Sequence, residues 1–143
     1  MKKIIVLLLV IASVPAMATD SLGTKLADKF SAAFPKATNV KWYTEGENTA
    51  VYYENEGITS HIWYDAQGEV VKTRRYYGEK DLAPFLKVKV SQKYPGKTIH
   101  GVTEISNREG LFYVVTLEDA KCWIQARFEP TGESTLVQKM KKS

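Results

Sequence analysis

The chain contains a similar helix-forming segment twice, and this repeat limits its possible folds more than any other feature. Residues 26–35 read LADKFSAAFP, and residues 86–95 read LKVKVSQKYP. When residues 21–35 are aligned with residues 81–95, five of the fifteen positions are identical. The identical pairs are Leu22/Leu82, Leu26/Leu86, Lys29/Lys89, Ser31/Ser91 and Pro35/Pro95. Such internal similarity indicates a chain built from two copies of one supersecondary unit.

Both copies predict an amphipathic α-helix. Apolar residues recur at every fourth position, a spacing that keeps them on one side of a helix. Ser21 and Asp81 precede the two helices, where a short side-chain oxygen can accept hydrogen bonds from free helix N–H groups. Pro35 and Pro95 end them, because proline disfavours the helical conformation in the residue before it. The apolar positions are Leu22, Leu26, Phe30 and Phe34 in the first copy, and Leu82, Leu86, Val90 and Tyr94 in the second.

Four short strands are predicted after each helix. The segments are rich in Val, Thr, Tyr and Trp and are separated by turn sequences, such as residues 45–48, 55–57, 66–68, 107–110 and 130–132. Intervals this short leave no room for crossover helices, so neighbouring strands should form antiparallel hairpins. A second match, WYDAQGEVV with RFEPTGEST, lies near the end of each copy at an offset of 64 residues.

These elements predict an α+β fold made of a tandem repeat of one helix plus four antiparallel strands. A unit of about 60 residues buries only about 60% of its unfolded surface, so two units gain by sharing one core. We expect a single domain over residues 19–143, with repeats at about 19–78 and 79–143. Both helices should pack on one face of a shared antiparallel sheet of up to eight strands, leaving the other face partly open. The order of the strands is left open.

The first 18 residues predict a cleaved secretory signal peptide. Lys2 and Lys3 precede an apolar run over residues 4–14, and Ala16-Met17-Ala18 provides small residues for cleavage. The run is shorter than the roughly 20 residues that a membrane-spanning helix needs. No membrane span is therefore expected after cleavage. We expect export to the periplasm, with release outside the cell as the alternative.

The helix ending in Phe-Pro, the strand Val40-Lys41-Trp42 and the Tyr-Asp-x-x-Gly sequence at residues 64–68 resemble the PepSY-like family of exported bacterial proteins. The second copy departs from this pattern, because Glu129 replaces the aspartate. The resemblance implies a fold related to the β-lactamase inhibitor proteins. It also implies, by analogy, binding or inhibition of a protein partner.

Strand alternation predicts which side chains face away from the helices. With Ile62 and Ile124 facing inward, the alternation turns the odd-numbered positions of their strands outward. Aromatic rings flanked by basic groups resemble the anchors of protein interfaces. The candidate partner-binding face comprises Tyr43, His61, Trp63, Trp123, Gln125 and Arg127. The alternative is that these aromatic residues only cover a half-solvated sheet and stabilise it through cross-strand pairs.

Charge does not favour nucleic-acid binding. The 20 basic residues fall to 18 once Lys2 and Lys3 are removed, against 16 acidic residues, which gives a formal charge of +2. Nucleic-acid binding needs a clustered basic face. The cluster over residues 72–75 is interpreted as part of a solvated strand.

No cofactor, metal or catalytic site is predicted. Two histidines and one cysteine, Cys122, lack the spacing of a zinc site, and Cys122 is expected to be a small buried hydrophobic residue. Common nucleophile, phosphate-binding and metalloprotease motifs are absent from the sequence. Carboxylate pairs such as Glu118/Asp119 fall at predicted turns, where solvent accounts for them.

The predicted function is therefore a non-enzymatic binding module. It engages or inhibits a protein or peptide in the cell envelope through the open face of the sheet. The alternatives are a binding protein for a small peptide or amphiphile, and an unrecognised hydrolase.

Overall fold

The structure, a computed structural model, describes residues 22–143. The predicted signal peptide lies outside these residues. In chain order the elements are α1 (Leu22–Ala33), β1 (Thr38–Glu45), β2 (Asn48–Asn55), β3 (Ile58–Tyr64), β4 (Val70–Tyr77), η1 (Glu79–Asp81), α2 (Pro84–Lys93), β5 (Thr98–Asn107), β6 (Gly110–Glu118), β7 (Cys122–Phe128) and β8 (Ser134–Lys141). Each half is a helix followed by four strands, so the predicted α+β class is confirmed.

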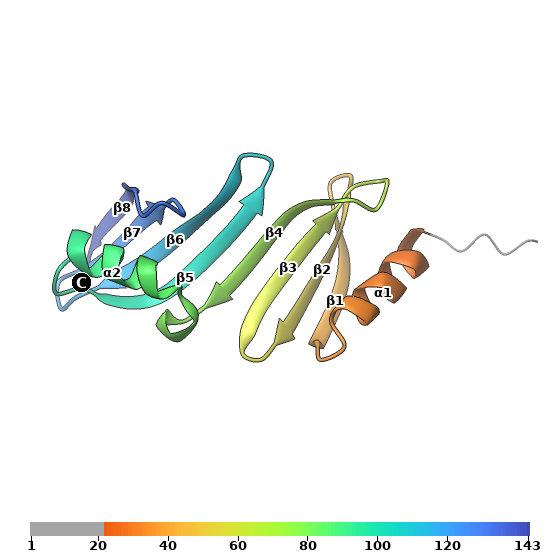
Figure 1. The fold of residues 1–143 in the computed structure, drawn as a ribbon, viewed down its shortest axis with the longest axis horizontal. Helices are drawn as coiled ribbons and strands as arrows, with labels where there is room; N and C mark the ends of the chain where they lie inside the picture. The colour runs from red at the N-terminus through yellow and green to blue at the C-terminus, as the bar shows by residue number, and fades with distance from the viewer. Residues whose placement is uncertain (1–21) are drawn as a thin grey trace, which may run out of the picture.

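All eight strands form one antiparallel sheet in the order of the chain, from β1 at one edge to β8 at the other. Every loop between neighbouring strands within a half is a hairpin, while η1 and α2 connect β4 to β5. Figure 1 shows the resulting long, twisted sheet, with α1 near the β1 edge and α2 near the β8 edge. The central strands β4 and β5 pair directly, which makes the sheet continuous across the two halves.

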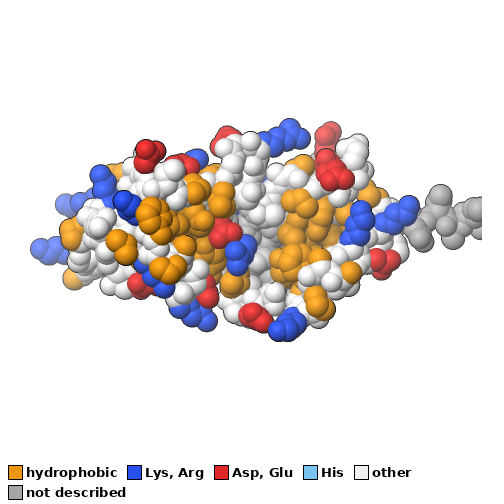
Figure 2. All heavy atoms as spheres, viewed as in Figure 1, with side chains coloured by type: hydrophobic (Ala, Val, Ile, Leu, Met, Phe, Trp, Pro, Cys, Tyr) orange, Lys and Arg blue, Asp and Glu red, His pale blue; other side chains and the backbone are white. Residues whose placement is uncertain are grey.

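Each helix packs its apolar side on the sheet and forms a core of its own. Leu26 and Phe30 of α1 are buried against β2 and β3, where Val51, Tyr53, Ile62 and Tyr64 complete the cluster. Leu86 and Val90 of α2 are buried in a larger cluster with Val102, Val115, Leu117, Ile124, Ala126 and Phe128. Burial of one such side chain stabilises the fold by roughly 1.5–3 kcal/mol. Figure 2 shows two areas of apolar side chains on this side of the molecule.

The second helix begins later than the sequence predicts. Asp81 does not cap it; the residue belongs to η1, and α2 starts at Pro84. The reason is that Pro84 disfavours a helical conformation at Ala83 and itself suits the first helical position. Leu82 is nevertheless buried, because the turn of η1 directs it into the core.

Two glycines explain the repeated sequence near the end of each half. Gly68 and Gly132 both have positive φ, 80° and 89°, which favours glycine. A Cβ on Gly68 would lie 3.2 Å from Leu22 of α1, and one on Gly132 would lie 2.6 Å from Lys89 of α2. The turns therefore pass close to helix side chains, and a larger residue would have to displace the side chain of Leu22 or Lys89.

The replacement of aspartate by glutamate changes the turn. The Asp65 carboxylate accepts hydrogen bonds from the backbone N–H groups of Gln67 and Glu69, both at 2.9 Å. The longer Glu129 side chain instead accepts from Nε of Arg127 at 2.7 Å. Only the first half thus uses its acidic residue to hold the turn.

Between the two helices, a polar group joins the halves on the helix-covered face. Glu104 of β5 accepts a hydrogen bond from Tyr77 of β4 at 2.7 Å and pairs with Arg75 at 3.1 Å. Burial and the Glu104 carboxylate raise the pKa of Tyr77, so the phenol stays protonated and remains a donor.

None of the helices in residues 22–143 has the length and apolar composition to span a bilayer.

Candidate partner-binding face

The face of the sheet opposite α1 and α2, hereafter the open face, carries no helix among the described residues. Strand pairing sets which side chains lie on it, because neighbours directly across a ladder share a face. In the first half, one row across the strands contains Tyr43, Ala50, Trp63 and Lys72, and the next contains Lys41, Tyr52, His61 and Arg74. The open face is thus rich in aromatic and basic side chains near β3 and β4.

The six candidate residues all lie on the open face, but in two groups. Tyr43, His61 and Trp63 come from β1 and β3, whereas Trp123, Gln125 and Arg127 come from β7. Strands β3 and β7 are four strand spacings apart, about 19 Å across a flat sheet. A small ligand could not contact both groups at once, whereas a protein surface could.

Trp63 points away from the helices, as the alternation predicts, yet its side chain is covered. The residue is only 5% exposed. The His61 ring stacks on it at 5.4 Å between centroids, and Lys72 and Arg74 lie over it at 4.6 and 5.5 Å. Its Nε1–H donates a hydrogen bond to the Glu45 carboxylate. Trp63 therefore supports the residues above it and does not itself offer a free anchor.

His61 is linked to the β1 edge and is kept neutral. Its Nδ1 lies 2.9 Å from the hydroxyl of Tyr43. Burial lowers the pKa of His61, and the positive charge of Arg74 lowers it further. The imidazole therefore contributes hydrogen bonding at neutral pH and adds no charge to this part of the face.

Lys72 and Arg74, which the sequence predicts to be part of a solvated strand, lie beside the candidate residues His61 and Trp63. Among residues 22–143, neither Lys72 nor Arg74 forms an ion pair. The nearby Glu54 is engaged by Tyr52 at 2.7 Å and by Asn39 at 2.9 Å. The signal that could have found them is the alternation Lys-Thr-Arg, which places both basic residues on one side of a strand.

A hollow of about 310 Å³ opens beside Arg74 on the open face. Thr59, His61, Arg74, Tyr76 and Thr103 line it, from strands β3, β4 and β5. Tyr76 is 49% exposed, and its ring lies over Gly101, where a Cβ would come within 2.6 Å of the phenolic oxygen. Glycine at this position therefore lets the ring form one wall of the hollow.

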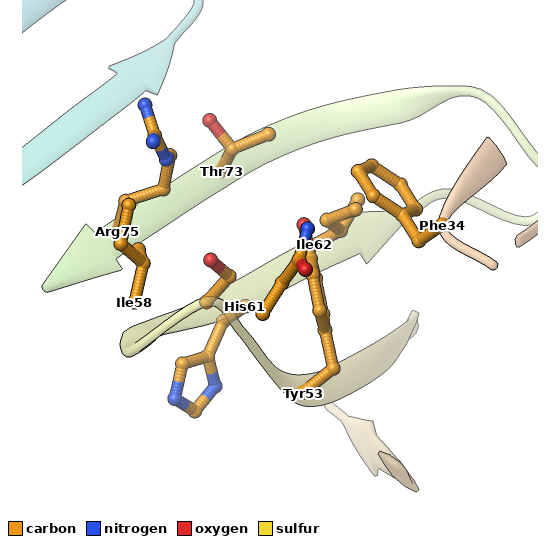
Figure 3. Close-up of a pocket in the computed structure, with 9 residues that line it drawn as sticks. Phe34, Tyr53, Ile58, His61, Ile62, Thr73 and Arg75 are labelled. Carbon is orange, nitrogen blue, oxygen red and sulfur yellow. The ribbon is translucent and has the colours of Figure 1, made fainter. Parts of the chain in front are cut away.

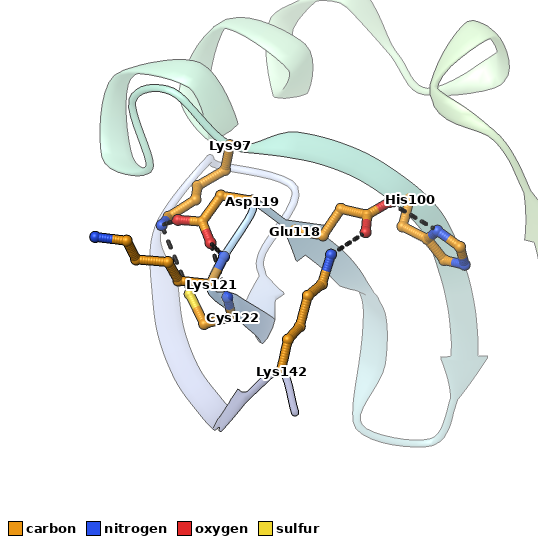
Figure 4. A network of polar contacts seen from close by, with 7 residues as sticks. All are labelled: Lys97, His100, Glu118, Asp119, Lys121, Cys122 and Lys142. Atoms are coloured by element: carbon orange, nitrogen blue, oxygen red, sulfur yellow. Dashed lines mark hydrogen bonds and ion pairs between the residues drawn. The ribbon is translucent and has the colours of Figure 1, made fainter.

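The group around Trp123 has the same aromatic and basic composition but paired charges. The His100 ring meets Trp123 edge-on at 4.8 Å, and Lys142 lies 4.5 Å from the ring centroid. Glu118 pairs with Lys142 at 2.7 Å and with His100 at 3.3 Å, as Figure 4 shows. The basic groups here are largely satisfied within the chain.

Arg127 completes the second group and is also paired. Its guanidinium lies 3.8 Å from the ring centroid of Phe112, and its Nε contacts Glu129. It is therefore less available to an acidic partner than Arg74.

A second polar network holds the β6–β7 turn. Lys97 donates to Asp119 and lies 3.7 Å from the sulfur of Cys122 (Figure 4). Lys97 and the backbone N–H groups of Lys121 and Cys122 hold the pKa of Asp119 well below its usual range. The interpretation of Asp119 as a merely solvated turn residue is wrong.

Cys122 is buried in the core, as predicted. Within residues 22–143, no group of three or more His, Cys, Asp or Glu residues could hold a metal ion.

A different hollow, of about 290 Å³, lies on the helix-covered face beside the end of α1. Figure 3 shows Phe34, Ile58 and Arg75 around it, contributed by separate segments. Oδ1 of Asn55, which also lines it, is buried without a hydrogen-bond partner in the described part of the chain. Apolar and polar side chains both line this hollow.

Comparison with known proteins supports the fold. No protein-family model matches the sequence, and no curated protein matches it. Similar solved structures include a BLIP-like protein from Bacteroides fragilis, with 21% identity, a TM-score of 0.60, and coverage of 81% of this chain and 83% of that chain. A DUF2874 family protein from Bacteroides ovatus has 18% identity, a TM-score of 0.62, and coverage of 85% and 89%.

A third similar structure is a protein from Bacteroides eggerthii provisionally assigned to the periplasm, with 14% identity, a TM-score of 0.61, and coverage of 81% and 86%. At these identities the likeness establishes a shared fold. The chain thus has a BLIP-like fold of two helices on one side of an eight-stranded antiparallel sheet.

Proposed function

We propose that this chain is an exported, non-enzymatic binding module of the bacterial cell envelope, of the PepSY-like kind, that contacts a protein or peptide through its open face. The observation that carries the proposal is the uncovered face itself. Both helices pack on the opposite side, while the open face carries exposed Tyr43 and Tyr76 together with Lys72 and Arg74, which have no ion pair among residues 22–143. Aromatic and arginine side chains are enriched among residues that dominate binding at protein interfaces.

Two further observations support the proposed location of the protein and its binding to a protein partner. The predicted signal peptide favours export, and a structural neighbour is provisionally assigned to the periplasm. The BLIP-like fold of another neighbour fits a module that binds proteins. The separation of the two aromatic groups fits a partner of protein size better than a small molecule.

Site-specific photo-crosslinking in the native host tests this proposal. A photoreactive phenylalanine analogue is placed at Tyr43 or Gln138, which lie on the open face, or at their chain neighbours Thr44 and Lys139, which lie on the other face. All four positions are exposed. We expect protein adducts from Tyr43 and Gln138 and none from the paired controls. Adducts confined to Thr44 and Lys139, or no adduct at any position, would contradict the proposal.

One observation favours the alternative of a small ligand. The hollow in Figure 3 is walled partly by Phe34, Ile58 and Ile62, and it contains a buried acceptor, Oδ1 of Asn55, that has no partner among residues 22–143. Its volume lies just below the roughly 300 Å³ at which ligand pockets usually begin. Binding of an apolar fluorescent probe that Ile58→Trp abolishes would support this alternative.

A further inference from the structure

We propose that the hollow beside Arg74 receives an acidic side chain of the partner protein, an aspartate or glutamate on a segment that lies across β3, β4 and β5. This inference rests on the proposed function, because it assumes that the open face is the contact surface. It adds the chemistry of the partner and the point at which that partner is recognised.

Positive charge on the open face of β4 is not balanced by ion pairs within the described residues. Lys72 and Arg74 are neighbours on the open face of β4, and neither has an acidic partner among residues 22–143. Glu45 and Glu54 on the same face are hydrogen-bonded to Trp63 and Tyr52 and form no ion pair with Lys72 or Arg74 in the described part of the chain, and these two carboxylates face three basic residues, since Lys41 lies on the same face. The first half of the open face therefore has an excess of unpaired positive charge, which complements an acidic surface.

The lining of the hollow suits a carboxylate. Arg74 supplies a planar set of N–H donors that can bind both oxygens of a carboxylate. The hydroxyls of Tyr76 and Thr103 line the same hollow and have no hydrogen-bond partner in the described part of the chain. The lining includes no carboxylate that would repel the incoming group.

The basic groups are also held in place before binding. Lys72 and Arg74 both lie over the ring of Trp63, which is itself fixed by its hydrogen bond to Glu45. Side chains that are already ordered lose less conformational entropy when a partner binds. Arg74 therefore differs from a freely mobile surface arginine.

A protein carboxylate fits this surface better than a nucleic acid. Nucleic-acid binding relies on many basic contacts along a phosphate backbone. In the described part of the chain, Lys72 and Arg74 are the adjacent pair of basic residues without an ion pair; Lys41 lies in the row of Arg74 but on β1, and Glu45 and Glu54 lie on the same face. A single acidic side chain matches the extent of the basic site.

An NMR titration with peptide probes tests the inference. The protein, labelled with ¹⁵N, is titrated at low salt with a tetraglutamate peptide and, in parallel, with a tetraglutamine peptide and a thymidine tetranucleotide. Two variants are compared: Arg74→Gln, and the matched control Arg75→Gln. The control removes the same charge from the next residue of β4, whose side chain lies on the opposite face and pairs with Glu104. Thermal melting of both variants confirms that they fold.

We expect tetraglutamate to shift amide signals of residues around the hollow, with weaker effects at β7 and β8. Arg74→Gln should weaken binding about tenfold, the range of a charge-assisted hydrogen bond, while Arg75→Gln changes it less than twofold. Equal loss in the two variants, equal binding of tetraglutamine, or Arg74-dependent binding of the nucleotide would overturn the inference. Crosslinks from Tyr43 in the host together with no tetraglutamate binding would overturn this inference alone and leave the proposed function standing.

Discussion

The two halves of the chain place a tryptophan on the open face in corresponding strands, yet they surround it differently. Trp63 is buried under Lys72 and Arg74, whose charges are unpaired among the described residues. Trp123 lies beside Lys142 and His100, and both of these groups are paired with Glu118. The two halves therefore have the same arrangement of a helix and four strands but different surfaces. The basic side chains around Trp63 have no ion pairs among the described residues, whereas those around Trp123 are paired with Glu118.

This comparison separates the role of a tryptophan in the fold from its role in recognition. A ring under two basic side chains stabilises and orients them, each contact being worth about 0.5–1 kcal/mol. The double replacement of Trp63 and Trp123 would therefore alter the fold as well as the surface. Variants of exposed residues, such as Tyr43 and Arg74, report on binding more cleanly.

The largest expected difference between the halves is in stability. Trp63→Ala leaves a cavity on the sheet and should lower the free energy of unfolding by about 3 kcal/mol. Trp123→Ala, at a half-buried position, should lower it by about 1 kcal/mol. Urea unfolding followed by circular dichroism measures both. Equal losses in the free energy of unfolding would contradict the proposed difference between the surroundings of Trp63 and Trp123.

A smaller effect is expected from the acceptor of the Trp63 indole. Glu45→Ala leaves the Nε1–H of a buried ring unpaired and should cost about 1 kcal/mol in the free energy of unfolding. The matched change on the surface, Glu56→Ala, removes an exposed contact with Lys36 and should cost much less. A larger loss for Glu56→Ala would contradict the assigned role of Glu45.

The lowered pKa of His61 predicts a dependence of stability on pH. Its folded-state pKa lies below the unfolded value of about 6.5, so the unfolded chain binds more protons as pH falls through that value. Its contribution to stability is complete above about pH 6.5 and decreases as pH falls toward the folded-state pKa. The titratable groups that face it include Arg74, Lys72, Glu45, Tyr43 and Tyr52.

His61→Gln should remove this part of the pH profile, measured as the melting temperature between about pH 5 and 7. His100→Gln serves as the control, because it retains His61 and should retain the dependence. An unchanged profile in His61→Gln would show that another group is responsible.

The smallest effect concerns the turn in the second half. The depressed pKa of Asp119 contributes stability that is present above its unfolded value of about 3.9 and is lost as pH falls below it. Lys97→Met removes the first cause of that depression. The variant should therefore lose less stability than the wild type on acidification below about pH 4, as followed by thermal melting. A steeper acid loss in the variant would contradict this account.

Much of the fold could be predicted from the sequence. The apolar spacing of Leu26 and Phe30, with proline following, specified the helices, and turn residues at short intervals specified hairpins. The start of α2 differs from the prediction because Pro84 takes the first helical position, which the apolar spacing alone does not indicate. Strand order could not be predicted, since alternation fixes which face a side chain occupies and does not identify the neighbouring strand.

The candidate site was predicted in outline only. Alternation placed Trp63 and Trp123 on the correct face, but burial of Trp63 depends on side chains from β1 and β4 that pairing brings over it. Lys72 and Arg74 were missed for the same reason. Whether a basic residue is paired or free depends on cross-strand neighbours, such as Glu118 beside Lys142, that lie far apart in the sequence.

The most direct test combines the comparison of the halves with the charge at the hollow. Photo-crosslinking yield in the native host is measured from Tyr43 and from Gln138, each in an Arg74→Gln and an Arg75→Gln background. We predict a higher yield from Tyr43 than from Gln138, and loss of the Tyr43 adduct with Arg74→Gln only. An adduct at Tyr43 that persists in Arg74→Gln, or that disappears equally in Arg75→Gln, would contradict the account.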